Sequence, residues 1–188
     1  MAEIRSIAVI GAGAIGRGIA YAAALGGYRT ILEDILPSSL RTAAAELRER
    51  LARAADLGTM SKPEASAAFN RLEYASTVEH AAREADLVIE AVPEELESKI
   101  EIFTLLDKIC RPHTILVSNT TSLSVNDLAS VTYRPEKVAG MRFANAASSP
   151  GRLKIVRARL TNDETMAACI DVGKRMGNEV VVIAEEAL

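Results

Sequence analysis

The segment Ile7-Ala8-Val9-Ile10-Gly11-Ala12-Gly13-Ala14-Ile15-Gly16 joins a short apolar run to three glycines in the spacing GxGxxG. The apolar residues 7–10 predict a buried strand, and the alanine-rich residues from Ala14 to about Leu25 predict a helix. A glycine-rich turn between a first strand and a first helix is typical of dinucleotide-binding sites. The alternative interpretation is a small-residue turn in an alanine-rich protein.

Each glycine of the motif has its own expected role. Gly11 permits a tight turn, Gly13 lets the backbone approach a pyrophosphate, and Gly16 lets the helix pack closely against the sheet. The free N–H groups and the positive dipole end of the helix, at Ala14 and Ile15, would then bind the phosphates. These five residues are therefore candidate cofactor-binding residues.

Asp34 lies 18 residues after Gly16, directly beyond a second predicted strand at about residues 30–32. An acidic side chain at this point accepts hydrogen bonds from the hydroxyls of an adenosine ribose. Because an anion repels a 2′-phosphate, we expect the cofactor to be NAD rather than NADP. Glu33 precedes Asp34, and strand alternation points the two side chains to opposite faces. The alternative is that Asp34 merely ends a strand.

Strands and helices alternate along the rest of the chain, which predicts an α/β fold with a mainly parallel, doubly wound, Rossmann-type sheet and a small antiparallel extension. A single NAD-binding domain over residues 1–188 is expected, with a projecting arm of two antiparallel helices at about residues 37–70. The expected strands are residues 4–10, 30–32, 72–75, 86–92, 114–118, 138–143, 153–156 and 179–183, and the expected helices are residues 14–25, 37–57, 78–84, 94–109, 125–129, one opening at Ser61 and one capped by Thr161 or Asn162 that runs to about Met176.

The composition argues against several other classes of protein. The chain has 188 residues, a formal charge of −3 and few aromatic residues (4%), without clusters of Lys and Arg, so nucleic acid is not an expected partner. No apolar run approaches the roughly 18 residues that span a bilayer, and no basic segment precedes an apolar one. We therefore expect a cytoplasmic protein without membrane contact. Cys110 and Cys169 have no CxxC spacing and no nearby histidine, which predicts reduced thiols and no metal site.

Further motifs follow the glycine turn in a specific order. They are Asp34, Ile89-Glu90-Ala91-Val92-Pro93-Glu94, Lys99, Ser118-Asn119-Thr120-Thr121-Ser122 and Gly140-Met141-Arg142-Phe143-Ala144-Asn145. In order and spacing the chain resembles, from about residue 4 to residue 184, the NAD-binding domain of L-3-hydroxyacyl-CoA dehydrogenases. The resemblance implies an NAD-dependent oxidoreductase of fatty acid metabolism, which transfers a hydride between NAD and a 3-hydroxyacyl-CoA or a related hydroxy acid.

The resemblance also implies which residues form the site. Thr121 and Asn145 are candidate catalytic residues as well as cofactor-binding ones, and the arm at residues 37–70 corresponds to the family's CoA-contacting arm. The resemblance implies that Glu94, Lys99, Thr121 and Asn145 lie on the nicotinamide side of the cofactor. The full set of cofactor-binding residues that these motifs imply is Ala91, Val92, Glu94, Lys99, Asn119, Thr121 and Asn145.

Two catalytic positions depart from the family. Arg142 stands where the family has its histidine base, and Lys154, 12 positions on, replaces the glutamate that orients this base. Arg142 cannot act as a base because arginine keeps its proton at neutral pH, and Lys154 could do so only if its pKa fell by about three units. His80 and His113 are expected to be solvated and away from the cofactor.

The two replacements leave two hypotheses open. A pair of cations would attract a carboxylate or phosphate, which predicts an oxidoreductase with impaired or altered substrate chemistry. Equally, the replacements can reflect drift in a non-catalytic NAD-binding module that senses the cofactor or partners another subunit. The family continues into a helical substrate and dimerisation domain beyond the position of Leu188. We therefore expect this chain to lack that domain, and to form a homodimer or to bind a helical partner domain.

Overall fold

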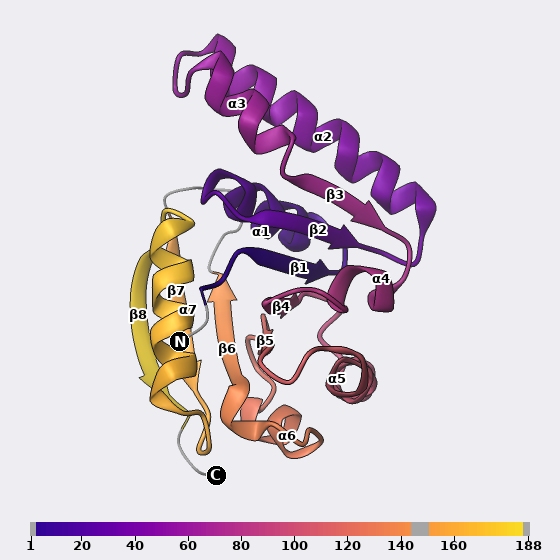
Figure 1. Cartoon of the computed structure of the whole chain (residues 1–188), viewed down its shortest axis with the longest axis vertical. Helices are drawn as coiled ribbons and strands as arrows, with labels where there is room; N and C mark the ends of the chain where they lie inside the picture. Colours follow the sequence, from indigo (N-terminus) through magenta and orange to yellow (C-terminus); the bar gives the residue numbers. More distant parts are fainter. Residues whose placement is uncertain (1–2, 144–150, 186–188) are drawn as a thin grey trace.

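One eight-stranded sheet runs through the computed structural model, which describes residues 3–143 and 151–185. The strand order is β3-β2-β1-β4-β5-β6-β7-β8 (Figure 1). The strands are β1 (Ser6–Ile10), β2 (Arg29–Glu33), β3 (Leu72–Ala75), β4 (Leu87–Glu90), β5 (Ile115–Ser118), β6 (Val138–Phe143), β7 (Arg152–Arg157) and β8 (Glu179–Ala184). The described helices are α1 (Ala14–Leu25), α2 (Pro37–Asp56), α3 (Lys62–Phe69), α4 (Val78–Ala82), α5 (Leu96–Ile109), α6 (Val125–Ser130) and α7 (Asp163–Arg175), with a 3₁₀ turn at Pro135–Lys137.

The strand directions confirm the predicted doubly wound, mainly parallel sheet. In the order of the sheet, each strand from β3 through β2, β1, β4 and β5 to β6 pairs in parallel with its neighbour. Strands β6 and β7 pair antiparallel, and β7 and β8 are parallel again. The chain passes from β1 to β2 on one side and later returns to place β4 on the other side of β1. Such a reversal opens a crevice at the carboxyl ends of the strands, where open α/β sheets bind their ligands.

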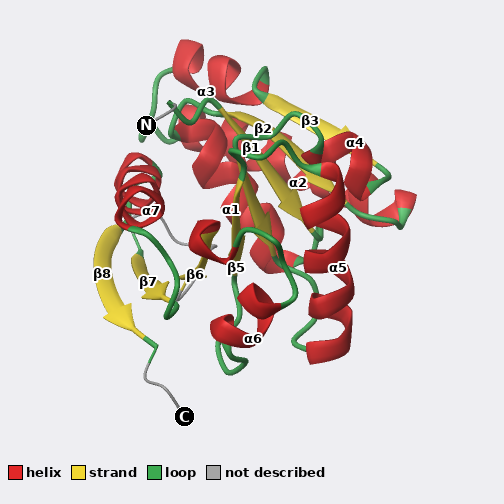
Figure 2. Ribbon diagram, turned by 60° about the horizontal axis from the view of Figure 1, so that its bottom comes forward, coloured by secondary structure: helices red, strands yellow, loops and turns green. Residues whose placement is uncertain are grey.

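Helices cover both faces of the sheet, as expected from the alternation. The central strands β1 and β4 are buried along their whole length, which explains why they are nearly continuous apolar runs. On one face the core contains residues of α1, α2, α3 and α7. On the other face the core contains residues of α4, α5 and α6, and Figure 2 shows α4 and α5 on the side away from α7.

The predicted arm is present as α2 and α3, which pack together beside β3 at one end of the molecule (Figure 1). Ser61 begins α3 through a capping box with Glu64, in which each residue's side chain accepts from the other's backbone N–H. Helix α2 buries Ala43, Leu47 and Leu51, which lie on one helical face at spacings of four. This face joins the core on the α1 side of the sheet.

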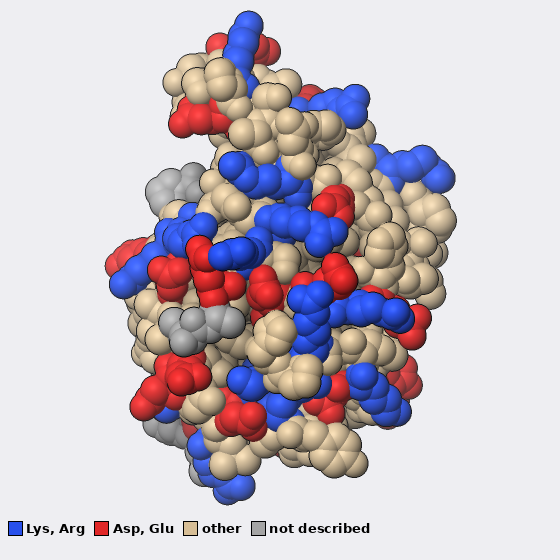
Figure 3. Space-filling model, in the orientation of Figure 1, with Lys and Arg blue, Asp and Glu red and all other residues tan. Residues whose placement is uncertain are grey.

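Four further features of the described residues bear on possible sites: surface charge, apolar helices, metal-ligand clusters and the two cysteines. Positive and negative side chains are interspersed on the face that Figure 3 shows. Within residues 3–143 and 151–185, no helix is both long and apolar enough to cross a membrane. In the same ranges no group of three or more His, Cys, Asp or Glu residues is placed to hold a metal ion. Cys110 and Cys169 are free and buried, and burial raises the pKa of the Cys110 thiol to about 11.

Candidate functional site

A groove of about 1070 Å³ lies at the carboxyl ends of the parallel strands, where the strand order reverses. Its volume is slightly above the range of roughly 300–1,000 Å³ that is usual for small-molecule and cofactor sites. The wall follows the sheet from the segment after β3, through the turns after β2, β1 and β4, to the segment after β5. The groove therefore crosses five strand ends in a line, which is long enough for an extended ligand.

The glycine turn forms the middle of this wall. Gly11 has a φ of +103°, a backbone conformation that L side chains rarely adopt, and a Cβ there would lie 2.8 Å from the Ala91 carbonyl oxygen. A Cβ at Gly16 would lie 1.8 Å from the Gly11 carbonyl oxygen, so α1 can approach the strand only with glycine at that position. A Cβ at Gly13 would meet no atom within 4 Å, and Gly13 lines the groove. The backbone at Gly13 is therefore open to a ligand.

Helix α1 presents its amino terminus to the groove. Ala14 and Ile15, in its first turn, line the wall, and no side chain caps its first N–H groups. These free donors and the positive end of the helix dipole form a ready site for an anion. The arrangement fits the pyrophosphate of a dinucleotide, the group expected here from the sequence.

Asp34 directly follows β2 and lines the groove next to the glycine turn. Its Oδ2 accepts a hydrogen bond from the Ala12 N–H at 2.9 Å, and its Oδ1 accepts one from the Leu36 N–H at 2.9 Å. The carboxylate is thereby fixed, and each oxygen keeps a further lone pair for a ligand hydroxyl. The position fits the ribose contact expected of Asp34, and the two backbone contacts add a role in shaping the turn.

Glu33 is expected to point to the opposite face of the strand from Asp34. The structure places it in the groove wall, with only 4% of the residue exposed. Its carboxyl group has no hydrogen-bond or ion-pair partner in residues 3–143 and 151–185. Burial, with the nearby charge of Asp34, raises the pKa of Glu33 to about 7. An acidic residue within an apolar strand was the only signal in the sequence.

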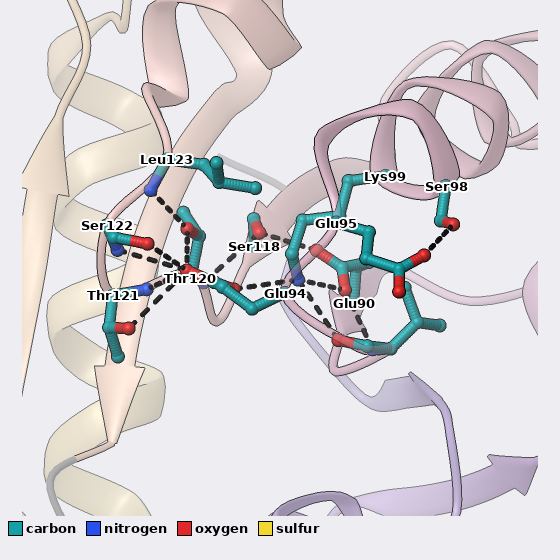
Figure 4. Close-up of polar contacts among 11 residues, drawn as sticks. Glu90, Glu94, Glu95, Ser98, Lys99, Ser118, Thr120, Thr121, Ser122 and Leu123 are labelled. Carbon is teal, nitrogen blue, oxygen red and sulfur yellow. Dashed lines mark hydrogen bonds and ion pairs between the residues drawn. The ribbon is translucent and has the colours of Figure 1, made fainter.

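A buried ion pair supports the turn after β4 (Figure 4). The Lys99 Nζ lies 2.7 Å from Glu90 Oε1 and 3.4 Å from Glu94 Oε2, and it also donates to the Val92 carbonyl oxygen. The side chains of Lys99 and Glu90 are 1% and 0% exposed. Glu90 also accepts from the Val92 N–H and from the Ser118 hydroxyl. Lys99, expected to line the cofactor site, instead lies behind its wall and holds Glu94 and the turn.

Glu94 links the turn after β4 to the segment after β5 (Figure 4). Its Oε1 accepts hydrogen bonds from the Thr120 hydroxyl at 2.6 Å and from the N–H groups of Thr121 and Ser122 at 2.8 and 3.0 Å. Partial burial alone would raise the pKa of Glu94, but these hydrogen bonds outweigh it and lower the pKa to about 2. Glu94 therefore stays ionised and holds the two segments together at this end of the groove.

Four residues of this network were not predicted as site residues: Glu90, Ser118, Thr120 and Ser122. All four lie inside the motifs that carry the family resemblance. A glutamate at the end of the apolar strand β4 was a usable signal, because a buried carboxylate requires a counter-ion. The partner, Lys99, is nine residues further on and comes close only through the turn into α5.

The remaining predicted residues after β4 and β5 do lie in the groove wall. Ala91, Val92, Asn119 and Thr121 all line it. The Asn119 Oδ1 accepts from the Phe143 N–H at 3.0 Å, which connects the wall to β6. Thr121 is exposed at the edge of the groove, where its hydroxyl faces Glu94 at 3.4 Å.

Arg142 and Lys154 are directly opposite each other in the antiparallel pair β6–β7. Arg142 is half-buried, and its Nε is buried without a hydrogen-bond partner in the part of the chain that the structure describes, whereas Lys154 is exposed. Neither residue lines the groove. Asn145 lies outside the described residues. His80 and His113 are exposed and lie outside the groove, as expected.

Comparison with known proteins gives the family. Residues 6–187 match the family model described as the NAD binding domain of 3-hydroxyacyl-CoA dehydrogenase. The chain belongs to this family. The resemblance seen in the sequence motifs is thereby confirmed, and so is NAD, the expected cofactor, as the ligand of this family of domains.

Individual relatives agree with this 3-hydroxyacyl-CoA dehydrogenase assignment. A probable 3-hydroxybutyryl-CoA dehydrogenase of Bacillus subtilis is 38% identical over 181 residues, which are 96% of this chain and 63% of the relative. A mitochondrial hydroxyacyl-coenzyme A dehydrogenase of Sus scrofa is 33% identical over 95% of this chain and 58% of its own length. The crystal structure of 3-hydroxybutyryl-CoA dehydrogenase from Escherichia coli superposes with a TM-score of 0.93 at 31% identity, over 97% of this chain and 39% of that one. The chain thus spans about three fifths of the length of these curated relatives.

The charges of the groove suit NAD in this 3-hydroxyacyl-CoA dehydrogenase domain. Four carboxylate residues line it, namely Glu33, Asp34, Glu79 and Glu94, and no Lys, Arg or His among the described residues does so. Among the described residues, the amino terminus of α1 is therefore the positive group that the groove offers to the phosphates of NAD. A 2′-phosphate next to Asp34 would add about two further negative charges with no cation to bind them.

Proposed function

We propose that this chain is the NAD-binding part of an oxidoreductase, which transfers a hydride between NAD and a 3-hydroxyacyl-CoA or a related hydroxy acid. One observation carries the proposal. A single groove extends from the open glycine turn and Asp34 to Thr121, whose N–H donates a hydrogen bond to Glu94. When bound, NAD supplies the hydride acceptor of the reaction.

Each part of the groove holds a different part of the cofactor. The N–H groups at the start of α1 hold the phosphates, and Asp34 holds the adenosine ribose. Asn119 and Thr121 contact the nicotinamide side, and Asn145 joins them there by family resemblance. Glu94 and Lys99 position this side without moving a proton, because Glu94 stays ionised and Lys99 stays paired with Glu90.

Arg142 and Lys154 give the substrate side a different chemistry from that of the family. Arginine is not a base at any working pH, so Arg142 binds an anion instead of accepting a proton. Its unpartnered buried Nε and the lysine directly opposite on β7 support this role. The substrate of this variant therefore carries a carboxylate or phosphate close to its hydroxyl carbon.

A non-catalytic NAD-binding module is the second candidate function. The observation that favours it is the lack of a free general base among the described residues at the Thr121 end of the groove, since Glu33 and Glu79 line the groove from β2 and α4. No histidine lies there, and the acids Asp34 and Glu94 are already hydrogen-bonded to backbone N–H groups. Such a module binds NAD and responds to it through a partner subunit.

Turnover separates the two functions. We expect the purified chain to reduce NAD, followed by the ultraviolet absorbance of NADH, with at least one member of a panel of 3-hydroxyacyl-CoA thioesters and free hydroxy acids. Substrates that carry an additional carboxylate should react best, and an Arg142→Gln variant should lose this preference. Binding of NADH without turnover over the whole panel, also after addition of a relative's helical domain, would favour the non-catalytic module.

Cofactor selectivity is a second expected outcome. NADH should bind at least about tenfold more tightly than NADPH, because Asp34 and its neighbouring carboxylates repel the 2′-phosphate. Titration calorimetry with the two reduced cofactors measures the two dissociation constants. Equal dissociation constants would contradict the role given to Asp34.

The expected partners follow from the same proposal. A small-molecule substrate and either a second copy of the chain or a helical partner domain are the expected partners. The cytoplasmic location, the single-domain organisation over residues 1–188 and the absence of nucleic-acid and membrane partners stay predictions from the sequence.

A further inference from the structure

Glu33 is a buried acid that the proposed function leaves without a role. Of the four carboxylate residues that line the groove in the described ranges, Asp34 and Glu94 are hydrogen-bonded to backbone N–H groups and Glu79 is exposed. Glu33 is 4% exposed, and its carboxyl group has no hydrogen-bond or ion-pair partner among the described residues. The Glu33 carboxyl oxygens are not among the fully buried, unpartnered polar atoms of the described residues, so they are accessible from the groove that Glu33 lines. A ligand in the groove can therefore supply the hydrogen bonds that the protein does not.

The order of the strands places Glu33 at a defined part of the cofactor. The groove passes the ends of β5, β4, β1, β2 and β3 in that sequence. With the pyrophosphate at the turn after β1 and a ribose at Asp34 after β2, the next group of the dinucleotide is the adenine base. The base then lies toward β3, where apolar side chains, among them Leu36 and Val78, line the groove beside Glu33.

The surroundings of Glu33 favour its neutral form. The nearest charge along its own strand is that of Asp34, and Glu79 of α4 lines the same groove. On the other side of β1, the charge of Glu90 is compensated by Lys99. No cation among the described residues lines the groove. Burial and the charge of Asp34 raise the pKa of Glu33 to about 7, so the neutral acid is abundant near neutral pH.

A neutral carboxyl group matches adenine better than a carboxylate does. Its O–H donates to a ring nitrogen while its carbonyl oxygen accepts from the 6-amino group, whereas a carboxylate can only accept. The same two-bond pattern is made by the amides of Asn and Gln on adenine. We infer that Glu33 recognises the adenine base as a neutral carboxylic acid, and that dinucleotide binding therefore takes up a proton. This inference rests on the proposed binding of NAD in the groove.

Proton uptake is measured directly by titrating the chain with NADH in two buffers of different protonation enthalpy. Below a pH of about 7, Glu33 is already neutral and little uptake is expected. Above about 7, the ionised acid must recover a proton on binding, so uptake approaches about one proton and the affinity for NADH falls by up to about tenfold per pH unit. A dissociation constant that is independent of pH, without proton uptake, would overturn the inference.

Variants identify the group that takes up the proton. A Glu33→Gln chain mimics the neutral acid, so it should bind NADH with nearly the low-pH affinity of the parent at every pH and without proton uptake. The matched control Glu79→Gln removes an exposed carboxylate from the same groove and should keep the pH dependence. Proton uptake that persists in Glu33→Gln would assign it to another group and overturn the inference.

A cofactor analogue tests the base. The reduced dinucleotide whose base is unsubstituted purine has hydrogen in place of the 6-amino group, so the Glu33 carbonyl oxygen loses its donor. This analogue should bind the parent about tenfold more weakly than NADH at a pH of about 6. Equal affinity for the two would overturn the adenine contact. Failure of NADH to bind at any pH would instead defeat the proposed function, so the two failures are distinguishable.

Discussion

Replacing Lys99 by methionine is expected to lower the free energy of unfolding by about 3–5 kcal/mol. The variant leaves the Glu90 carboxylate, which is 0% exposed, without its cation at 2.7 Å. Methionine keeps most of the apolar stem of lysine, so the lost free energy of unfolding reflects the missing charge rather than lost packing. Urea unfolding of the parent and the variant measures the difference.

Two controls show that this loss comes from the buried pair. The double variant Lys99→Met with Glu90→Gln should recover part of the stability, because the unpaired charge is then removed. Arg29 and Glu73 form a similarly short pair at 2.7 Å, but both side chains are about half exposed. Arg29→Met should therefore cost less than about 1 kcal/mol. A Lys99→Met chain as stable as Arg29→Met would contradict the importance of the buried pair.

Replacing Gly13 by alanine should weaken NADH binding by about 100-fold and change the free energy of unfolding by less than about 1 kcal/mol. The new methyl group meets no protein atom within 4 Å, and the φ of −65° at this position suits alanine. The methyl group instead occupies the space in which the pyrophosphate approaches the backbone. Titration calorimetry and urea unfolding measure the two quantities separately.

Gly16→Ala is the matched comparison within the same turn. Its methyl group would lie 1.8 Å from the Gly11 carbonyl oxygen, so the strand and α1 must separate and several kcal/mol of stability are lost. The two variants therefore divide the motif into a position that serves the ligand and a position that serves the fold. If Gly13→Ala binds NADH like the parent, the groove is not where the pyrophosphate lies.

The fold was predictable because local and tertiary signals agree. The helix predicted from Ala14 to about Leu25 occupies those residues, and the strands at 72–75 and 138–143 have the predicted bounds. Other predicted elements differ by one or two residues at an end: 30–32 is one residue too short at each end, whereas 4–10, which begins at Ser6, is too long. The outer residues of such runs have the right composition but lack a neighbouring strand. The 3₁₀ turn at Pro135–Lys137 was not predicted.

The site was predictable only where a role depends on sequence spacing. The glycine turn and Asp34 lie along one groove because their separation follows from one strand–helix–strand unit, and their contacts with NAD stay predictions. The function of Lys99 was misplaced because the direction of its side chain depends on the path of the turn before α5. The burial of Glu33 was missed because it depends on α4 and α5 covering that face of the sheet. The roles of Arg142 and Lys154 stay predictions.

Asp34 also limits how this protein can be redesigned. Its two oxygens hold the backbone on either side of it, one at Ala12 and one at Leu36. A protein engineer who replaced Asp34 by a small neutral residue to admit a phosphorylated ribose would also release both backbone groups. Conversion to NADP use therefore requires coordinated changes in both loops, so that selectivity and loop shape evolve together in this domain.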